Sequence, residues 1–388
     1  MPSNSPASRW AETPILIAAL SARALAASAR RGGFIPWVLD VFNDADTLAC
    51  AAHSRCVAWG AEGLRAQDVL DAAAGLASST EGLVYGSGFE RQPELLGQLE
   101  QRVRVFGNTA ATVAAAKAPA DFFALLDNFD IPHPETSLQP PTDARGWLLK
   151  HGGGAGGVHI RCADPAHTVQ PGCYFQRLWA GCPMSVLFLA DGKQAHVIGY
   201  NAQWITPGLD QPFRYGGAIN HAALGERLAG QISAVVSRLV TALGLKGLNG
   251  IDFMVEGDSY AVLEVNPRPT ATCDLYDADY HTGLFAAHIA ACCGELGDLQ
   301  PSERTVRAHA IVYTPCAGVV PAALRWPDWV SDRPHAQTHC PADFPLCTVY
   351  AHGAEHGAVR NLLAQRLKTV TQWFEGAQRD TTLLCVTN

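Results

Sequence analysis

The sequence predicts an α/β fold with more than one domain. At 388 residues the chain is longer than one ordinary domain, and its 48% hydrophobic content allows a sizeable core. An apolar strand over 15–20, an Ala-rich helix over 22–31 and a second strand over 36–41 form a βαβ opening. Further on, a long amphipathic helix precedes a hairpin of two alternating strands, which fits the same fold class.

The remaining elements follow from capping and periodicity signals. Asn108-Thr109 can cap a helix over 110–117, and Pro119 suits the first position of the next helix. Apolar residues at helical spacing from 224 to 243 predict a helix with one buried face. Strands over 147–150 and 158–161, a strand over 82–85, and helices over 281–293 and 359–375 complete the prediction.

The βαβ opening has no Gly-x-Gly-x-x-Gly after its first strand, so it lacks a dinucleotide-binding fingerprint. The strand that ends at residue 85 leads into Gly-Ser-Gly-Phe-Glu over 86–90. Ligands of open α/β sheets bind at the carboxyl ends of strands, so this turn is a candidate for substrate contact. A plain connecting loop is the alternative.

Composition disfavours several classes of protein. The formal net charge is −8 and the pI is about 5.9, unlike most surfaces for nucleic acid or anionic membrane. No apolar run approaches the roughly 18 residues of a membrane helix. The twelve cysteines lack a framework spacing, so we expect reduced thiols in the cytoplasm. Residues 14–29 weakly resemble a signal peptide, but a buried first strand is the better interpretation because a basic leading segment is nearly absent.

One hairpin carries the most informative residues of the chain. Two strands of alternating apolar and polar residues flank a Gly-Asp-Ser turn. If Glu256 pairs with Tyr260, Asp252 lies directly opposite Glu264, and Asn266 points to the same face two residues on. The other, buried face would then carry Ile251, Phe253, Val255, Ala261, Leu263 and Val265.

Two opposed carboxylates indicate a metal site. They repel each other across a strand ladder, and a divalent cation removes that repulsion. Mg²⁺, or Mn²⁺ in its place, takes carboxylate and amide oxygens together with phosphate oxygens. Asp252, Glu264 and Asn266 are therefore candidate metal ligands. The alternative is a solvated acidic face, although a surface hairpin does not need the order Glu-Val-Asn-Pro-Arg.

A second motif suits phosphate. Lys150 ends a strand and is followed by a loop with almost no side chains. Backbone N–H groups in such a loop can approach phosphate oxygens closely. The loop lacks the ending of a Walker-type motif, and a flexible turn is the alternative, although six small residues are long for a turn. The loop consists of Gly152, Gly153, Gly154, Ala155, Gly156 and Gly157.

Lysine usage supports the phosphate interpretation. The chain has five lysines, and arginine carries nearly all the other positive charge. Lysine is a compact point charge that suits phosphate, so a lysine retained in such a sequence is a functional candidate. Lys117 and Lys150 are the only two in the first 190 residues.

Together these features resemble the ATP-grasp superfamily over about 108–275. In that family one lysine precedes a Pro-containing helix, and a second ends the strand before a glycine-rich lid. The resemblance implies that Lys117 and Lys150, with the loop over 152–157, hold the phosphates of ATP. Arg268 matches an arginine that meets the transferred phosphate or the acyl phosphate, so the implied catalytic residues are Arg268 and Lys150.

The resemblance also assigns the remaining ligands. Asp252, Glu264 and Asn266 match the Mg²⁺ ligands of the family. The strand that holds adenine usually reads Gln-Glu-Tyr-Ile-x-Gly, and here the segment is 174–181. This alignment implies ATP contacts from Gln176, Arg177 and Leu178. Gln176 departs from the family pattern, because an acid that helps to hold the nucleoside is common at that position.

The implied architecture is an α/β ATP-grasp fold with a Rossmann-like N-terminal domain, a lid subdomain and a C-terminal ATP-grasp subdomain. The expected N-terminal domain covers 1–107, and linker helices with the glycine-loop lid cover 108–180. The ATP-grasp C-terminal subdomain with the metal hairpin covers 181–299. A C-terminal accessory module covers 300–388.

A narrower resemblance spans the whole chain. The segments 85–90, 266–272 and 345–349 are similar to biotin-carboxylase-related ATP-grasp ligases associated with biosynthesis of one-carbon-carrier cofactors of the methanopterin and methanofuran type. This resemblance implies an ADP-forming carboxylate–amine ligase that makes an amide through an acyl phosphate. The expected partners are a small-molecule carboxylate and an amine, without nucleic acid or membrane, and a homodimer is left open.

Three alternatives use the same ATP site. A small-molecule kinase would stop at a stable phosphoester, and a biotin-carboxylase-like enzyme would activate bicarbonate. A degenerate module would bind ATP without turnover, although the complete Asp/Glu/Asn set argues against it. The sequence does not identify the acid or the amine.

Overall fold

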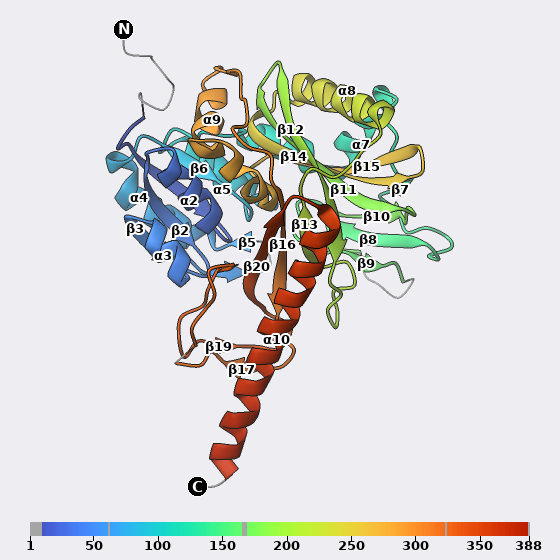
Figure 1. Cartoon of the computed structure of the whole chain (residues 1–388). Helices are drawn as coiled ribbons and strands as arrows, with labels where there is room; N and C mark the ends of the chain where they lie inside the picture. The colour runs from blue at the N-terminus through green and yellow to red at the C-terminus, as the bar shows by residue number, and fades with distance from the viewer. Residues whose placement is uncertain (1–9, 61–62, 165–168, 323, 387–388) are drawn as a thin grey trace.

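The computed structural model of the chain describes residues 10–60, 63–164, 169–322 and 324–386. Its architecture is mixed α/β, as the sequence predicts (Figure 1). Three sheets carry most of the strands, and each comes from a different part of the chain. The helices of the first and third parts pack against their sheets, so the main cores lie between helix and sheet.

The N-terminal segment forms a parallel sheet with helices around it (Figure 1). Its elements are β1 (Pro14–Ala19), α2 (Arg23–Arg31), β2 (Ile35–Asp40), α3 (Ala45–Cys50), β3 (His53–Cys56), the small pair β4 (Trp59–Gly60) and β5 (Gly63–Leu64), α4 (Ala66–Leu76), η1 (Ala77–Ser79), β6 (Leu83–Tyr85) and α5 (Pro93–Glu100). The strand order is β3-β2-β1-β6, and β1 pairs in parallel with β2 across α2. The predicted βαβ opening is therefore confirmed. Both faces of β1 are buried, with Leu16 in one core cluster and Ile17 in the other.

A small antiparallel sheet follows, in the order β7-β10-β8-β9. The elements are α6 (Ala110–Lys117), α7 (Pro119–Asn128), β7 (Thr136–Ser137), β8 (Trp147–His151), β9 (Arg161–Cys162) and β10 (Cys173–Arg177). The Thr109 side chain accepts a hydrogen bond from the Thr112 N–H and caps α6, as predicted. The predicted strand over 158–161 is wrong, because the turn of the glycine loop continues to residue 159 and only Arg161–Cys162 pairs.

The third sheet is antiparallel, in the order β15-β14-β11-β12-β13-β16-β20-β18. Its strands are β11 (Cys182–Asp191), β12 (Ala195–Ile205), β13 (Tyr215–Ile219), β14 (Lys246–Glu256), β15 (Ser259–Asn266), β16 (Val306–Tyr313), β18 (Val330–Ser331) and β20 (Pro345–Gly353). The other elements are α8 (Glu226–Leu243), η2 (Ala271–Leu275), η3 (Asp277–Asp279), α9 (Gly283–Cys292), the pair β17 (Gly318–Val319) and β19 (His339–Cys340), and α10 (His356–Val386).

This sheet joins the hairpin to the C-terminal segment. β16, β20 and β18 continue the same sheet, so these C-terminal strands share it with β14 and β15, while β17 and β19 form a separate pair. α10 packs along β16 and β20 and then extends away from the body (Figure 1). The predicted helix over 359–375 lies within the longer α10. The expected domain boundaries themselves stay a prediction.

α8 supplies the main core of the third sheet. Its apolar stripe packs on β11, β12 and β14 together with α7. Leu228, Ile232, Val236 and Leu239 are at most 5% exposed, which confirms the predicted buried face. Gly244 ends the helix at φ +64°, a left-handed conformation that glycine adopts without steric cost.

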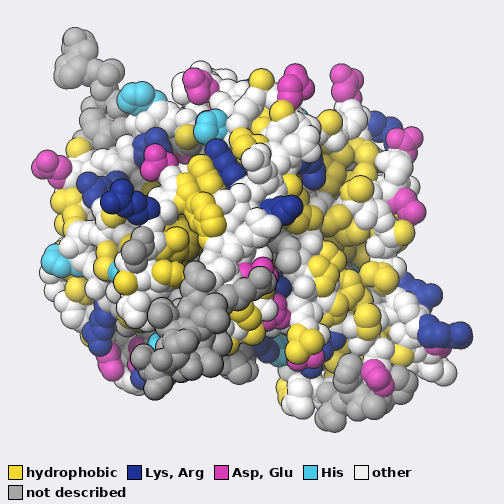
Figure 2. Space-filling view, turned by 60° about the horizontal axis from the view of Figure 1, so that its bottom comes forward, with side chains coloured by type: hydrophobic (Ala, Val, Ile, Leu, Met, Phe, Trp, Pro, Cys, Tyr) yellow, Lys and Arg dark blue, Asp and Glu magenta, His cyan; other side chains and the backbone are white. Residues whose placement is uncertain are grey.

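The surface is mixed in character. Figure 2 shows acidic and basic side chains scattered among apolar ones on one face of the described part of the chain. Among the described residues, no helix is long and apolar enough to cross a membrane.

We predict that Leu239→Ala lowers the free energy of unfolding by about 2–5 kcal/mol, because it leaves a cavity in the α8 core. Urea denaturation followed by circular dichroism would measure the change. Gln231→Ala, on the exposed face of the same helix, is the matched control and should change stability by less than about 0.5 kcal/mol. Equal effects of the two substitutions would contradict this assignment of the core.

Candidate active site

The hairpin places Asp252 opposite Glu264, as predicted. The turn of the hairpin differs from the prediction. It contains only Gly257 and Asp258, so Glu256 pairs with Ser259 and not with Tyr260. A register shift between Asp252 and Phe253 then restores the predicted pairing at the acidic residues. A β-bulge of this kind inserts one unpaired residue and commonly re-aims a side chain near a functional site.

The bulge changes which side chains of β15 are buried against α8. Tyr260 and Val262 join the core there, in place of the predicted Ala261 and Leu263. Leu263 is only partly buried. The predicted face is therefore wrong near the turn, because a single extra residue reverses the alternation of the strand, although Ala261 is buried as predicted. It is correct at Val265, beyond the bulge.

The three predicted metal ligands meet in one hydrogen-bonded cluster. Asn266 Nδ2 donates to Asp252 Oδ2 at 2.8 Å, and Gln203 Nε2 donates to Asp252 Oδ1 at 3.0 Å. The Lys117 ammonium lies 2.7 Å from Glu264 Oε2 and 3.2 Å from Asn266 Oδ1. Two carboxylates and an amide oxygen form the donor set that Mg²⁺ takes, so these residues fit such an ion.

Burial and neighbouring charges shift the pKa values of the two carboxyl groups in opposite directions. Burial, together with the neighbouring Glu264 charge, raises the pKa of Asp252. Burial acts in the same direction on Glu264, but the charges of Lys117 and Lys150 outweigh it and lower the pKa of that carboxyl. Glu264 is therefore the anion that balances the Lys117 ammonium, and Asp252 carries the cost of a second negative charge that is only partly exposed to solvent.

Lys150 faces the same cluster from β8. Its ammonium donates to Gln176 Oε1 at 3.1 Å and lies 5.8 Å from the centre of the Tyr174 ring. Burial lowers the pKa of Lys150, while the carboxylates of Glu264 and Asp252 oppose that shift. Gln176 Nε2 is buried and has no hydrogen-bond partner among the described residues. A buried unpaired amide is costly, so Gln176 is a candidate for a ligand contact.

The glycine loop is seated on backbone carbonyls of two other segments. A Cβ atom on Gly152 would lie 2.7 Å from the Lys117 carbonyl oxygen, and one on Gly153 would overlap the Glu90 carbonyl. Gly153 has φ +73°, which strains other L residues. The loop is tied down further on, because the Tyr215 N–H donates to the Gly156 carbonyl at 2.9 Å. Close packing and backbone conformation therefore both explain its glycines.

Arg268 is held by the loop that follows β6. Its guanidinium Nε donates to Glu90 Oε1, and both side chains are buried. Glu90 Oε2 accepts from the N–H groups of Gly88 and Phe89 at 2.8 and 3.0 Å. Burial opposes ionisation of Glu90, but Arg268 lowers the pKa of its carboxyl. The turn over 86–90 is thus joined to the end of the metal hairpin.

The segment 174–181, which is predicted to contact adenine, is only partly available for backbone contacts. The Arg177 N–H donates to the Glu135 carbonyl, and the Leu178 N–H donates to the Gly146 carbonyl, both at 2.8 Å. A nucleotide that needs either N–H would have to displace these bonds. The Leu178 side chain is exposed, so it can cover an adenine face.

Sequence reasoning missed several residues at this site. Gln203 comes from β12, whose pattern gives no signal of a contact with Asp252. His159 is half-buried with its ring against Gly154, and desolvation lowers the pKa of its imidazole to about 4. Glu90 lies in the turn already considered, but its pairing with Arg268 joins positions 178 residues apart. The signal in the sequence that could have identified Glu90 is a single acidic residue directly after a glycine-rich turn.

Comparisons with known proteins identify the fold that carries this site. A family model described as an ATP-grasp domain matches residues 121–272. The chain has an ATP-grasp fold. A search of curated proteins finds no significant match.

Solved structures match most of the chain at low sequence identity. Carboxyaminoimidazole ribonucleotide synthase from Aspergillus clavatus, complexed with ATP, has a TM-score of 0.69 at 14% identity and covers 94% of this chain and 99% of its own. The biotin carboxylase domain of the Hydrogenobacter thermophilus 2-oxoglutarate carboxylase, in complex with MgADP and bicarbonate, has a TM-score of 0.70 at 12% identity, with 92% and 89% covered. L-amino acid ligase from Bacillus licheniformis has a TM-score of 0.67 at 13% identity, with 92% and 98% covered. These likenesses show the fold, and the narrower resemblance to cofactor-biosynthesis ligases stays a prediction.

We predict that Gly157→Ala displaces the glycine loop, because the new Cβ would overlap the Phe213 carbonyl and the position has φ +71°. Loss of the hydrogen bond from the Tyr215 N–H to Gly156 should accelerate exchange of that amide at least about tenfold. Gly156→Ala is the matched control, because it has a similar φ of +64° and open space around its Cβ. Equal exchange in the two variants would contradict the seating of the loop.

Proposed function

We propose that the protein is an ATP-dependent carboxylate–amine ligase that forms an amide through an acyl phosphate and releases ADP and phosphate. The observation that carries the proposal is the cluster in which Lys117 and Asn266 bridge two opposed half-buried carboxylates, facing Lys150. Bringing two half-buried carboxylates and two buried lysines together is expensive, and a structural role does not require it. A site for a metal-bound triphosphate does, because phosphate and cation complete the charge balance.

Different residues would bind the metal, the phosphates and the rest of the nucleotide. Asp252, Glu264 and Asn266 would hold Mg²⁺, which when bound neutralises phosphate oxygens. Lys117 and Lys150 would contact the phosphates as point charges. The glycine loop would cover them with backbone N–H groups, and its closeness to Lys117 supports this role. Gln176, with its unpaired amide nitrogen, would contact the nucleotide beside Lys150.

The reaction would have two steps. A substrate carboxylate oxygen attacks the γ-phosphorus, the bond to the β-phosphate oxygen breaks, and ADP leaves. The nitrogen of an amine then attacks the acyl carbon, loses a proton, and expels phosphate as the amide forms. Arg268, fixed by Glu90, would stabilise charge on the transferred phosphate. Closure of the loop would exclude water, which otherwise hydrolyses an acyl phosphate.

A bicarbonate-activating enzyme is the second candidate, because two of the similar structures are named as a biotin carboxylase domain and a carboxyaminoimidazole ribonucleotide synthase. A small-molecule kinase would use the same ATP site. A setting in cofactor biosynthesis rests on the narrower sequence resemblance alone. The ligase, the bicarbonate-activating enzyme and the kinase differ in the substrates that must be added and in the products that form.

We predict that ADP and phosphate form from ATP only when an acid and an amine are both present. Quenched reactions with candidate acids and amines, separated by ion-exchange chromatography, would measure all nucleotides and phosphate. Phosphate release with bicarbonate would support the carboxylase candidate, and ADP with a stable phosphoester would support the kinase. Formation of AMP and pyrophosphate would contradict attack at the γ-phosphate.

We also predict that Glu264→Gln lowers turnover of ATP by more than about a hundredfold, because it removes a charged ligand and the partner of Lys117. Circular dichroism and urea denaturation would check that the fold survives. Glu256→Gln, at the exposed end of the same hairpin, is the matched control and should keep full activity. Activity of Glu264→Gln within about tenfold of the parent would exclude the metal assignment.

A further inference from the structure

A cavity of about 190 Å³ lies beside Arg268. Its walls come from the start of α2, the turn after β6, residues 268–277, the start of α9, and the strands β16 and β20. The N-terminal segment and the third sheet with its connecting segments therefore both line it, at the end of the metal hairpin. Arg268 belongs both to this wall and to the proposed site of phosphate transfer, so a molecule in the cavity can reach the acyl phosphate.

The size of the cavity limits what it can hold. A cavity of about 150 Å³ binds benzene, so 190 Å³ suits a molecule of fewer than roughly a dozen non-hydrogen atoms. A whole nucleotide is too large. Much of the lining is apolar, which suits a molecule with a hydrocarbon body. The apolar side chains are Leu25, Leu248, Leu284, Phe285 and Ile311.

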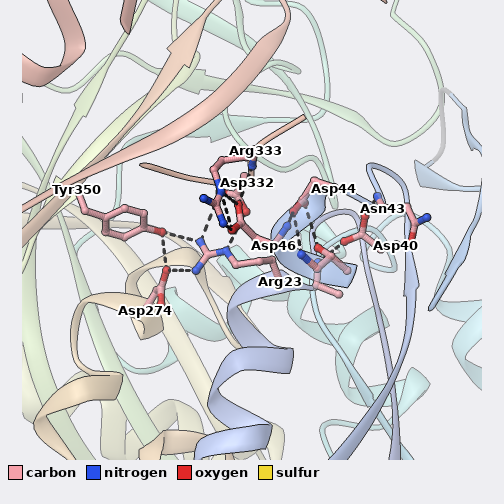
Figure 3. A network of polar contacts seen from close by, with 11 residues as sticks. Arg23, Asp40, Asn43, Asp44, Asp46, Asp274, Asp332, Arg333 and Tyr350 are labelled. Atoms are coloured by element: carbon pink, nitrogen blue, oxygen red, sulfur yellow. Dashed lines mark hydrogen bonds and ion pairs between the residues drawn. The ribbon is translucent and has the colours of Figure 1, made fainter. Parts of the chain in front are cut away.

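One end of the cavity carries a net negative charge. Arg23 binds two carboxylates at once, with Nη1 2.9 Å from Asp274 Oδ2 and Nε 3.0 Å from Asp332 Oδ1 (Figure 3). Its Nη2 also donates to the Tyr350 hydroxyl at 2.6 Å. One guanidinium against two carboxylates leaves one negative charge. The helix dipole at the start of α2 adds about half a positive charge, which does not cancel it.

Each of the other charged side chains in the lining is paired with a side chain of opposite charge. Arg268 is paired with Glu90, and Asp277 is paired with Arg31 at 3.0 Å. Because Arg23 already donates to three groups, it has little capacity left for a carboxylate ligand. The charge balance therefore favours a cation over an anion at this end.

Two polar atoms at the same end lack partners within the described residues. Asp274 Oδ2 accepts from both Arg23 and Tyr350, whereas Asp274 Oδ1 accepts no hydrogen bond there. His309 is 3% exposed, and its Nδ1 is buried without a partner, while its Nε2 lies 2.8 Å from the Tyr215 hydroxyl. Burial lowers the pKa of His309 to about 4, so its ring is neutral near pH 7 and one ring nitrogen can accept a hydrogen bond.

We propose that this cavity is the acceptor subsite and that the acceptor is a small primary amine with an apolar body, whose ammonium group lies on Asp274 with His309 Nδ1 as second partner. The role of this amine as the acceptor in the reaction rests on the proposed ligase function, whereas the binding of an amine in the cavity does not. The acid substrate would bind outside the cavity, because the excess negative charge disfavours it here.

Calorimetric titration of the full chain tests the proposal with three probes of one shape: 2-phenylethylamine, 2-phenylethanol and 3-phenylpropanoate, each with and without Mg²⁺ and ADP. The amine should bind at least tenfold more tightly than the alcohol or the acid. Asp274→Asn should remove that preference, and Asp332→Asn is a second variant in case the first does not fold. Asp46→Asn, which removes a carboxylate paired with Arg333 nearby but outside the cavity lining, is the matched control and should bind like the parent (Figure 3).

The outcomes separate this proposal from the proposed function. Tighter binding of the acid or the alcohol, no binding of the amine, or unchanged amine binding in both cavity variants would overturn the proposal. Titration with ATP alone is measured in parallel. Amine binding without any ATP binding would contradict the proposed ligase function and support the amine site. ATP turnover without amine binding would contradict the amine site and leave the proposed function supported.

Discussion

The opposed carboxylates of Asp252 and Glu264 are the constraint on which the site depends. Two half-buried negative charges across one ladder are unstable unless positive or hydrogen-bonding groups reach them. The chain supplies these groups from three places: Lys117 at the end of α6, Gln203 on β12, and Asn266 on the hairpin itself. The positions of α6 and β12 against the hairpin are therefore fixed by charge as well as by packing.

The same cluster organises the surrounding loops. The glycine loop rests on the carbonyl groups of Lys117 and Glu90, and Glu90 in turn holds Arg268. Since Arg268 follows Asn266 by two residues, the turn after β6, the glycine loop and the hairpin form one connected surface. This connection explains why three sheets of different origin meet at one point. It also explains why the glycines cannot be enlarged where they touch backbone oxygens.

The sequence predicts well what depends on neighbours along the chain. The βαβ opening, the cap at Thr109 and the buried stripe of α8 follow from local periodicity and capping residues. The pairing of Asp252 with Glu264 is predicted correctly, but the turn that leads to it is not. The bulge does not follow from local periodicity, because two compensating register errors produce the same pairing. Contacts such as Arg268 with Glu90 or Arg23 with Asp332 join distant segments, and no periodicity encodes them.

Lys117 also shows how such a site can be stable and still exchange its partners. Its ammonium holds Glu264 Oε2 and Asn266 Oδ1, two of the oxygens that a cation would take. If a divalent cation binds there with a triphosphate, Lys117 can move from the carboxylate to a phosphate oxygen without losing a charged partner. Every buried charge remains compensated before and after the exchange, and the cost of desolvation is not incurred again. A carboxylate pair compensated only by arginines in fixed bidentate geometry would not exchange partners so readily, since lysine binds as a point charge on a flexible stem.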